Sequence, residues 1–180
     1  MDIKYYKIIV NGYDEEGGII YAPSDWPYPI AQDGEDVKNW QALVLELKDG
    51  VYRHFNRCVG GANVISSEFK EVLTPFISDY SAIEFLPVIV KSKEYGDKEY
   101  YIMHFKKIYD VIDRKNTIYV EGTDSIIKVR LDYNKVKDLH IFNTQPAVND
   151  VIVSAKLKNC IKRAKLGAGV IFHPIYCLNV

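Results

Sequence analysis

The residues best suited to catalysis or metal binding are scattered along this sequence. Histidine occurs at four positions, each in a strand-like segment beside an apolar or aromatic residue: His54, His104, His140 and His173. This setting is typical of packed structural histidines, although imidazole is also a common general base and metal ligand. Cys58 could form a thiol nucleophile pair with a distant histidine, but no neighbouring residue supports that hypothesis. We therefore expect no catalytic residue, no metal site and no cofactor.

Two glycine-rich segments lack the features of phosphate-binding loops. Residues 59–66, VGGANVIS, precede an expected helix, but they lack the Lys-Ser/Thr of a P-loop and the third glycine of a dinucleotide-binding loop. Residues 165–172, KLGAGVIF, follow a helix, whereas phosphate binds where a helix begins. Both segments therefore favour turns over ligand sites.

Charge is divided unevenly along the chain, although the 180 residues carry a net charge of only −1. Residues 1–50 contain four lysines and ten acidic residues, a net charge of −6, whereas residues 128–165 have a net charge of +6. The overall balance argues against a general nucleic-acid binder, which needs an excess of Lys and Arg. The two ends could attract each other, solvate separate faces, or present a surface of one sign to a partner.

An acidic, aromatic loop extends from Tyr13 to Asp36, with prolines and glycines that favour turns. Trp26 and Tyr28 could fill the core between the prolines, or they could be exposed anchors in a charged surround. Tight protein interfaces use anchors of the second kind, so we take this loop as the partner-binding hypothesis. Its residues are Tyr13, Asp14, Glu15, Glu16, Trp26, Tyr28, Asp33, Glu35 and Asp36.

A basic helix face near the C-terminus is the strongest electrostatic feature of the sequence. Its cations are Lys156, Lys158, Lys162, Arg163 and Lys165. Such a face could be a solvated helix surface whose cations suit the C-terminal end of the helix dipole. The rival hypothesis is a docking face for an acidic partner.

The elements that position these residues are expected to be mostly strands. Residues 3–10 are rich in β-branched and aromatic residues and stop at Asn11-Gly12. Residues 43–48 alternate and close on Asp49-Gly50, so residues 51–59 could return antiparallel to them. Residues 100–144 read as further short strands, with no helix long enough to be a crossover. These patterns predict one α+β domain over residues 1–180 with a mainly antiparallel, curved sheet.

A short unit occurs twice, at residues 63–88 and 149–176. In each copy a Val/Ile strand leads into a serine, Ser66 or Ser154, whose hydroxyl can cap a short amphipathic helix. A strand containing Phe-x-Pro follows, and Gly167 is expected to end the second helix in the left-handed conformation. We therefore expect two serine-capped helices from a pseudo-duplicated helix–strand unit, and two lobes, 1–90 and 91–180, related by a weak internal repeat.

Neither the cysteines nor the N-terminus suggests export. Cys58, Cys160 and Cys177 are odd in number and show no pattern, as expected for free thiols in a reducing cytosol. The apolar part of the N-terminus is too short for a signal peptide or a membrane span. We expect a cytoplasmic protein that contacts no membrane, and the sequence leaves its oligomeric state open.

The C-terminal segment, DVIVSAKLKNCIKRAKLGAGVIFHPI, resembles the ending of the bacterial immunity proteins of polymorphic toxin systems, immunity family eleven. Residues 63–69, NVISSEF, are similar to an upstream segment of that family, and the resemblance extends from about Trp40 onward. Val153, inserted between Ile152 and Ser154, departs from the family pattern. These matches are helix caps and core positions, so they indicate fold more than activity. They are Val151, Ile152, Ser154, Leu157, Gly169, Phe172, Pro174 and Ile175.

The resemblance implies a non-catalytic cytoplasmic protein that binds and neutralises one cognate protein toxin, often a nuclease. The acidic loop would suit a basic toxin, because toxin and antidote usually carry complementary charge. Two other classes stay open: a small-molecule or metabolite-binding domain with a tyrosine-lined pocket, and an uncharacterised hydrolase that uses the scattered His and Cys residues.

Overall fold

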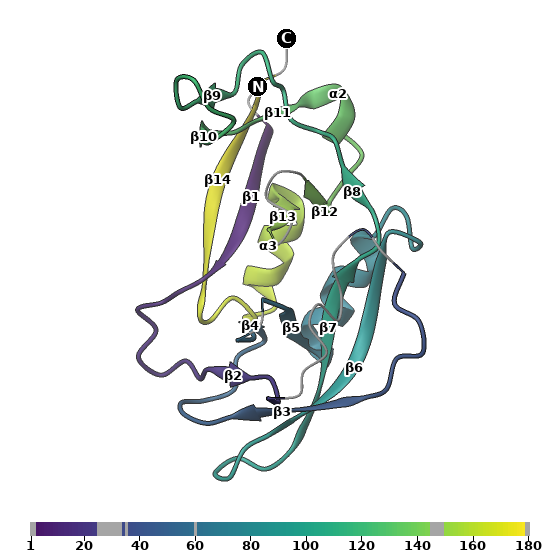
Figure 1. The fold of residues 1–180 in the computed structure, drawn as a ribbon, viewed down its shortest axis with the longest axis vertical. Helices are drawn as coiled ribbons and strands as arrows, with labels where there is room; N and C mark the ends of the chain where they lie inside the picture. The colour runs from purple at the N-terminus through teal and green to yellow at the C-terminus, as the bar shows by residue number, and fades with distance from the viewer. Residues whose placement is uncertain (1–2, 25–33, 35, 60, 145–149, 179–180) are drawn as a thin grey trace.

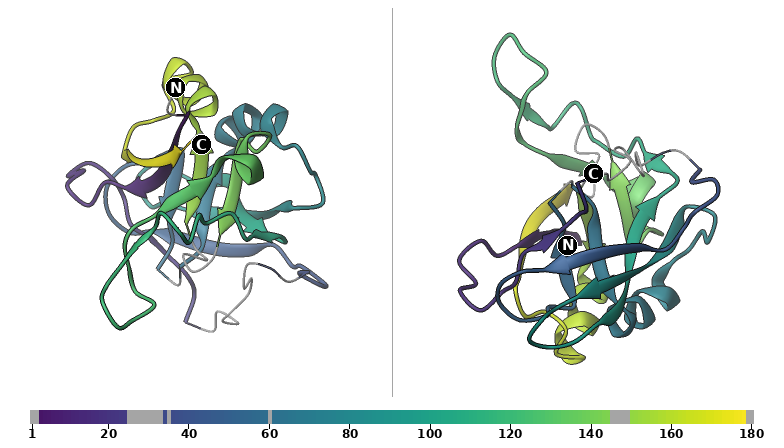
Figure 2. Two further views of the ribbon diagram at one scale, coloured as in Figure 1. Left: turned by 90° about the horizontal axis from the view of Figure 1, so that it is seen from above. Right: turned by 60° about the horizontal axis from the view of Figure 1, so that its bottom comes forward.

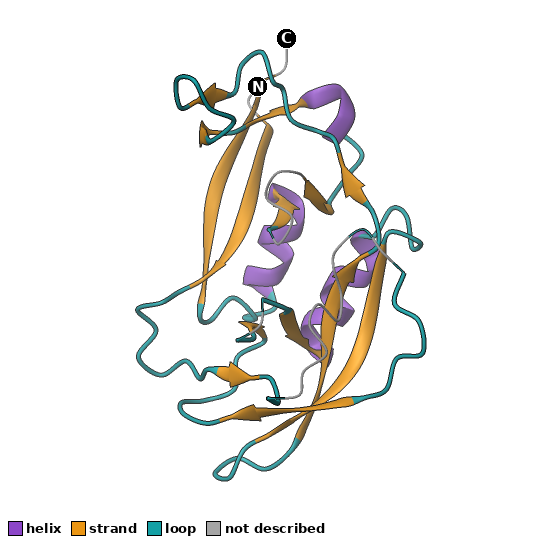
Figure 3. Cartoon of the chain, in the orientation of Figure 1, coloured by secondary structure: helices purple, strands orange, loops and turns teal. Residues whose placement is uncertain are grey.

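Strands dominate the protein and form two curved six-stranded sheets (Figure 1, Figure 3). The computed structural model describes residues 3–24, 34, 36–59, 61–144 and 150–178. In these residues it contains three short α-helices, one 3-10 helix and a separate two-stranded ribbon. The structure is consistent with the expected α+β class and its mainly antiparallel pairing, but two curved sheets replace the single sheet that the sequence predicted.

One sheet is built from the middle of the chain, in the order β2-β3-β6-β7-β5-β4. Its pairs are antiparallel except β3 with β6, which run parallel. The strands are β2 (Ile20–Tyr21), β3 (Leu43–Leu47), β4 (Phe55–Arg57), β5 (Asn63–Ser66), β6 (Ile83–Lys91) and β7 (Lys98–Phe105).

The other sheet combines the first strand with the C-terminal elements, in the order β11-β14-β1-β13-β12-β8. β1 lies between β13 and β14 and is antiparallel to both, while β11 with β14 and β12 with β8 are parallel. The strands are β1 (Ile3–Val10), β8 (Ile108–Tyr109), β11 (Arg130–Asp132), β12 (Ile141–Thr144), β13 (Val151–Ser154) and β14 (Val170–Leu178). The ribbon of β9 (Ile118–Tyr119) and β10 (Ile126–Lys128) projects from this end of the molecule (Figure 2, right).

The prediction that residues 51–59 pair antiparallel with residues 43–48 is wrong. Gly50 does turn the chain, with a φ of 74°. However, β4 pairs with β5, and β3 pairs with β2 and β6. Leu45 and Leu47 are buried in one core with Val88 and Val90 of β6, and this burial selects the parallel partner. The local turn signal did not contain that information.

Serine side chains begin the two longer helices, α1 (Ser67–Leu73) and α3 (Ala155–Arg163). The Ser66 hydroxyl accepts a hydrogen bond from the Phe69 amide at 3.2 Å, and the Ser154 hydroxyl accepts one from the Leu157 amide at 3.2 Å. Each bond satisfies an amide that the helix itself leaves without a partner. The short helices are the 3-10 turn η1 (Thr74–Phe76), which continues α1, and α2 (Tyr133–Val136).

The end of α3 differs from the expectation, because Lys165 and not Gly167 takes the left-handed conformation, with a φ of 59°. The Leu166 amide donates to the Ile161 carbonyl at 3.1 Å, and the Lys165 amide donates to that of Lys162 at 3.0 Å. These two bonds form a Schellman motif. Leu166 is buried in the core that contains Ile161, so burying this leucine fixes the helix end two residues before the glycine.

Lys165→Gly is expected to raise the free energy of unfolding by about 1 kcal/mol, because glycine adopts the left-handed conformation without the steric cost that lysine carries. A shift of the urea midpoint at an unchanged m-value measures the gain. Gly167→Ala is the matched control and should be close to neutral, since the new Cβ would lie 3.7 Å from its nearest neighbour, in the Phe172 ring. A destabilised Gly167→Ala together with an unimproved Lys165→Gly would contradict this assignment of the helix end.

The units β5–α1–β6 and β13–α3–β14 make matching contacts. The Ser66 amide donates to the His54 carbonyl at 3.0 Å, and the Ser154 amide donates to the His140 carbonyl at 2.9 Å. Strand β7 lies between β5 and β6, and β1 occupies the same place between β13 and β14.

Consecutive tyrosines of β7 and β1 continue this correspondence. Tyr100 is opposite Ser66 and Val88, and Tyr5 is opposite the equivalent residues Ser154 and Ile175. On the other face, the ammonium of Lys70 lies 3.7 Å from the centre of the Tyr101 ring, and that of Lys158 lies 3.6 Å from the centre of the Tyr6 ring. Strand β1 therefore completes the second unit as β7 completes the first. A common origin of the two units stays a prediction.

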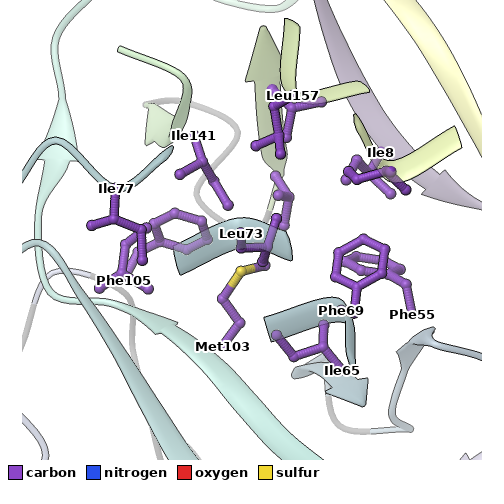
Figure 4. Close-up of a cluster of buried hydrophobic side chains, with 14 of the residues drawn as sticks. Ile8, Phe55, Ile65, Phe69, Leu73, Ile77, Met103, Phe105, Ile141 and Leu157 are labelled. Carbon is purple, nitrogen blue, oxygen red and sulfur yellow. The ribbon is translucent and has the colours of Figure 1, made fainter. Parts of the chain in front are cut away.

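The largest core lies between the two sheets, where α1 and α3 meet side by side (Figure 1). Phe69 and Leu73 from α1 and Leu157 from α3 lie in it (Figure 4). All three are fully buried, as is Ile161 of α3. Each sheet also covers a smaller core on its other face, one around Leu45 and the second around Tyr5, Phe142 and their neighbours. The central core therefore fixes the position of both helices, including the basic face of α3.

Candidate functional site

Residues 11–18, which contain the start of the acidic loop, lead from β1 toward β2 of the other sheet and are anchored by backbone hydrogen bonds (Figure 1). The Val51 amide donates to the Glu16 carbonyl at 2.8 Å, and the Gly18 amide donates to the Val51 carbonyl at 3.1 Å. At its other end, the Asn11 amide donates to the Gly169 carbonyl at 2.9 Å. Residues 11–18 are therefore a defined structural segment held at both ends.

Arg53 fixes the same loop through its side chain. Its Nε and Nη2 atoms donate to the two carboxylate oxygens of Asp14 at 2.7 and 2.9 Å. Both side chains are largely buried, and the guanidinium holds the pKa of Asp14 below its ordinary value. Two parallel bonds to one carboxylate give fixed geometry. Asp14, predicted as a partner contact, therefore anchors the loop.

Three residues of the predicted site are presented to solvent by this anchor. Tyr13 is 92% exposed, and its amide donates to the Asn11 side chain at 3.2 Å. Glu15 is exposed, and Glu16 remains 82% exposed although it lies 3.4 Å from Arg53. An aromatic ring with two carboxylates beside it is thus displayed on a fixed loop.

The rest of the predicted site falls elsewhere. Asp36 pairs with Lys106 at 2.9 Å, next to the end of β7, and the ion pair lowers the pKa of Asp36. Trp26, Tyr28, Asp33 and Glu35 lie outside the described residues. The structure thus brings Tyr13, Asp14, Glu15 and Glu16 together on one segment and places Asp36 against a different element.

A groove lies between α3 and the start of β14, next to the acidic loop. It has a volume of about 640 Å³ and is lined by Lys158 and Lys162 of the helix, by Lys165 just past the helix end, and by Val170 and Phe172 of the strand. A Cβ atom at Gly169 would lie only 2.8 Å from the Asp14 carboxylate, so the loop at the mouth of the groove packs directly on the acidic loop. The acidic and basic features that the sequence presents far apart are therefore neighbours.

Two of the three lysines that line this groove lie over aromatic rings, Lys158 over Tyr6 and Lys162 over Phe172. Among the described residues, none of the three forms an ion pair with a carboxylate. Neither this groove nor the role of Arg53 was predicted from the sequence. No local signal could have revealed them, because Arg53 is 39 residues from Asp14 and the groove joins a helix to a strand edge.

No curated protein matches the chain. The family model of the Imm11 immunity protein family matches residues 20–176. The chain belongs to the Imm11 immunity protein family.

The Imm11 match confirms the suspected immunity family and spans the elements from β2 into β14. The groove between α3 and β14 lies inside the matched region, whereas Tyr13, Asp14, Glu15 and Glu16 precede it. The metabolite-binding alternative is not favoured by this match. In the described part of this Imm11 protein, no helix is long and apolar enough to cross a membrane.

Two serine–histidine contacts in this Imm11 protein could be mistaken for catalytic dyads. His54 Nδ1 lies 2.8 Å from the Ser66 hydroxyl, and His140 Nδ1 lies 2.9 Å from the Ser154 hydroxyl. Both serines are buried, and each hydroxyl already accepts the capping bond of its helix. These pairs therefore stabilise the two helix starts.

Two of the three thiols, those of Cys58 and Cys177, are poorly suited to nucleophilic attack. Burial raises the pKa of both Cys58 and Cys177 to about 11, so they stay protonated at neutral pH. Cys160 is half-buried and receives a contact from the Arg163 guanidinium at 3.1 Å. Within the residues that the structure describes, no group of three or more His, Cys, Asp or Glu side chains could hold a metal ion.

The free energy of unfolding is expected to fall as the pH drops below 6.5, because burial and the charge of Lys156 lower the pKa of His140 from 6.5. A depressed histidine pKa means that the unfolded state binds the proton first, so acidification favours unfolding. Urea unfolding from pH 7.5 to 5 measures the slope, which should be shallower in His140→Gln. Equal slopes in His140→Gln and the unmodified protein would contradict the assignment.

Proposed function

We propose that this Imm11 protein is an antidote that binds one cognate bacterial toxin in the cytoplasm and neutralises it without catalysis. The family match over residues 20–176 carries the proposal. The preformed loop supports it further, because binding loses less entropy when the contact surface is already ordered.

The contact we propose is the exposed end of the acidic loop. Tyr13 supplies an aromatic anchor, and Glu15 and Glu16 supply negative charge beside it. Aromatic residues dominate the energy of many protein interfaces, while charges at the rim steer association. A toxin with a basic surface, such as a nuclease, would complement this end of the antidote.

The experiment begins with a tagged pull-down from the native cells, washed at low and then high salt, with retained proteins identified by mass spectrometry. A retained protein is the toxin if its expression alone stops growth and co-expression of the antidote restores growth. The interaction should weaken as salt rises, because exposed charges are screened. Failure of every retained protein to poison cells would overturn the proposal.

Site variants then test the contact. Tyr13→Ala should weaken toxin binding about tenfold or more and abolish growth rescue at low expression. Tyr80→Ala removes another largely exposed tyrosine, on a different segment, and should leave binding unchanged. Equal affinities for the two variants would exclude Tyr13 as an anchor while leaving the antidote assignment intact.

A further inference from the structure

Strand β14 presents residues 170–175, two thirds of its length, as a free sheet edge among the described residues. On one side β1 pairs with β14 from Val170 to Cys177, and on the other side β11 pairs only with Tyr176–Leu178. In the ordered sheets as described, no strand lies against the outer edge of residues 170–175. An unpaired edge offers backbone N–H and C=O groups to another strand.

The backbone groups that face outward can be assigned from one hydrogen bond. The Asn11 amide donates to the Gly169 carbonyl, so Gly169 faces β1. Residues of an antiparallel pair alternate in direction, which turns Ile171 toward β1 and Phe172 and Pro174 away from it. Proline has no N–H and is tolerated in this outward position. The Phe172 amide and the Phe172 and Pro174 carbonyls are therefore available at the edge.

The groove beside this edge is basic and partly apolar. Lys158, Lys162 and Lys165 form its helix side, and Val170 and Phe172 form its strand side. The Lys162 ammonium lies 5.9 Å from the centre of the Phe172 ring, so this cation is held over the strand. A segment that enters here meets a strand edge and a row of lysines together.

In the first unit, β5–α1–β6, the edge of β6 corresponds to the free edge of β14. There β3 pairs with β6 only at Val88–Lys91, as β11 pairs with the end of β14. Before that point, the Trp40 indole N–H donates to the Pro87 carbonyl at 3.0 Å, and Pro87 corresponds to Pro174. The Trp40 side chain therefore covers this edge in the first unit, whereas no described residue pairs with the equivalent edge of the second unit at Pro174.

We propose that the edge of β14 and the lysines of α3 form a docking groove for an extended acidic segment of a partner protein, which pairs with β14 as an additional strand. Main-chain bonds to residues 172–174 would hold the segment, and alternate acidic side chains would meet the lysines. That the partner is the cognate toxin rests on the proposed function.

The first test is independent of the toxin. A blocked octapeptide, Glu-Val-Glu-Thr-Glu-Val-Glu-Thr, is titrated into the isotope-labelled protein and followed by NMR. Saturable shifts are expected at the Phe172 amide and along α3. The matched peptide with lysine in place of glutamate should produce none. An absent response to the acidic peptide, an equal response to the basic one, or a response to single-stranded oligothymidylate alone would overturn the proposal.

Charge reversal tests the helix side. The double variant Lys162→Glu/Lys165→Glu should bind the acidic peptide about tenfold more weakly than the unmodified protein does. Lys115→Glu/Lys137→Glu makes the same change in net charge at exposed positions outside the groove and should bind normally. Circular dichroism and the urea midpoint verify that both variants are folded. Equal binding by the two variants would overturn the role of the lysines.

The toxin identified by pull-down then separates this inference from the proposed function. Hydrogen exchange should show protection of the Phe172 amide on toxin binding, and Lys162→Glu/Lys165→Glu should bind the toxin about tenfold more weakly than the control variant. Unchanged toxin affinity and an unprotected Phe172 would remove the groove from the toxin interface. The antidote assignment would stand in that case, because rescue of growth tests it separately.

Discussion

Phe69→Ala is expected to lower the free energy of unfolding by about 3–5 kcal/mol, the range for removing a fully buried phenylalanine. Phe69 is 0% exposed and lies with its ring centre 5.6 Å from that of Phe55, where α1 meets the sheet (Figure 4). The cavity left by alanine cannot close easily, because α3 and the second sheet fill the other side of the same core. Urea unfolding followed by tryptophan fluorescence and circular dichroism gives the change.

Two further variants make this result diagnostic. Leu157→Ala truncates the corresponding side chain of α3 in the same core and should lower the free energy of unfolding by about 2–5 kcal/mol. Tyr80→Ala removes a ring that is 68% exposed and should cost well under 1 kcal/mol. A loss below about 1 kcal/mol for both core variants would contradict a central core shared by α1 and α3.

Gly50→Ala is expected to lower the free energy of unfolding by about 1–3 kcal/mol and to displace the acidic loop. Gly50 has a φ of 74°, and an added Cβ would lie 2.7–2.8 Å from backbone atoms of residues 16–18. Backbone atoms cannot rotate away as a side-chain end can, so the loop must move. Because that loop carries Tyr13, the variant should also lose affinity for the toxin.

Gly122→Ala is the control that separates the steric clash at Gly50 from the energetic cost of placing alanine in the left-handed conformation. Gly122 has nearly the same φ, 73°, but a Cβ there would meet nothing within 4 Å. The free energy of unfolding of Gly122→Ala should fall by about 1 kcal/mol, because alanine is strained in the left-handed conformation, and the variant should keep full affinity for the toxin. The comparison uses the urea midpoint and the dissociation constant of each variant. Equal losses in the two variants would show that the loop does not pack on Gly50 as the structure describes.

Local features were predictable wherever the physics that specifies them is local. The Ser66 and Ser154 hydroxyls lie at the helix starts, because a cap depends on residues within one turn. The strand at Leu43–Leu47 followed from alternation, and the left-handed turn at Gly50 from the Asp-Gly sequence. The end of α3 was placed wrongly, because burial of Leu166 outweighed the preference of glycine for that conformation.

The candidate site was predictable only in part. Composition marked residues 13–16 as acidic and aromatic, but it could not show that Arg53 binds Asp14 and leaves Tyr13 as the exposed ring. It also could not show that the basic face of α3 borders a free strand edge. Both facts depend on contacts between residues far apart in the chain.

By itself, the sequence determined the class of the fold, the positions of most strands and helices, and the family to which the chain belongs. These follow from periodicity, capping and turn chemistry, which act over a few residues. Only the tertiary structure decided which strands are neighbours, why β1 lies between β13 and β14, and where the free edge of β14 lies. Strand pairing is chosen by burying side chains from distant segments in one core, so no short stretch of sequence can specify it.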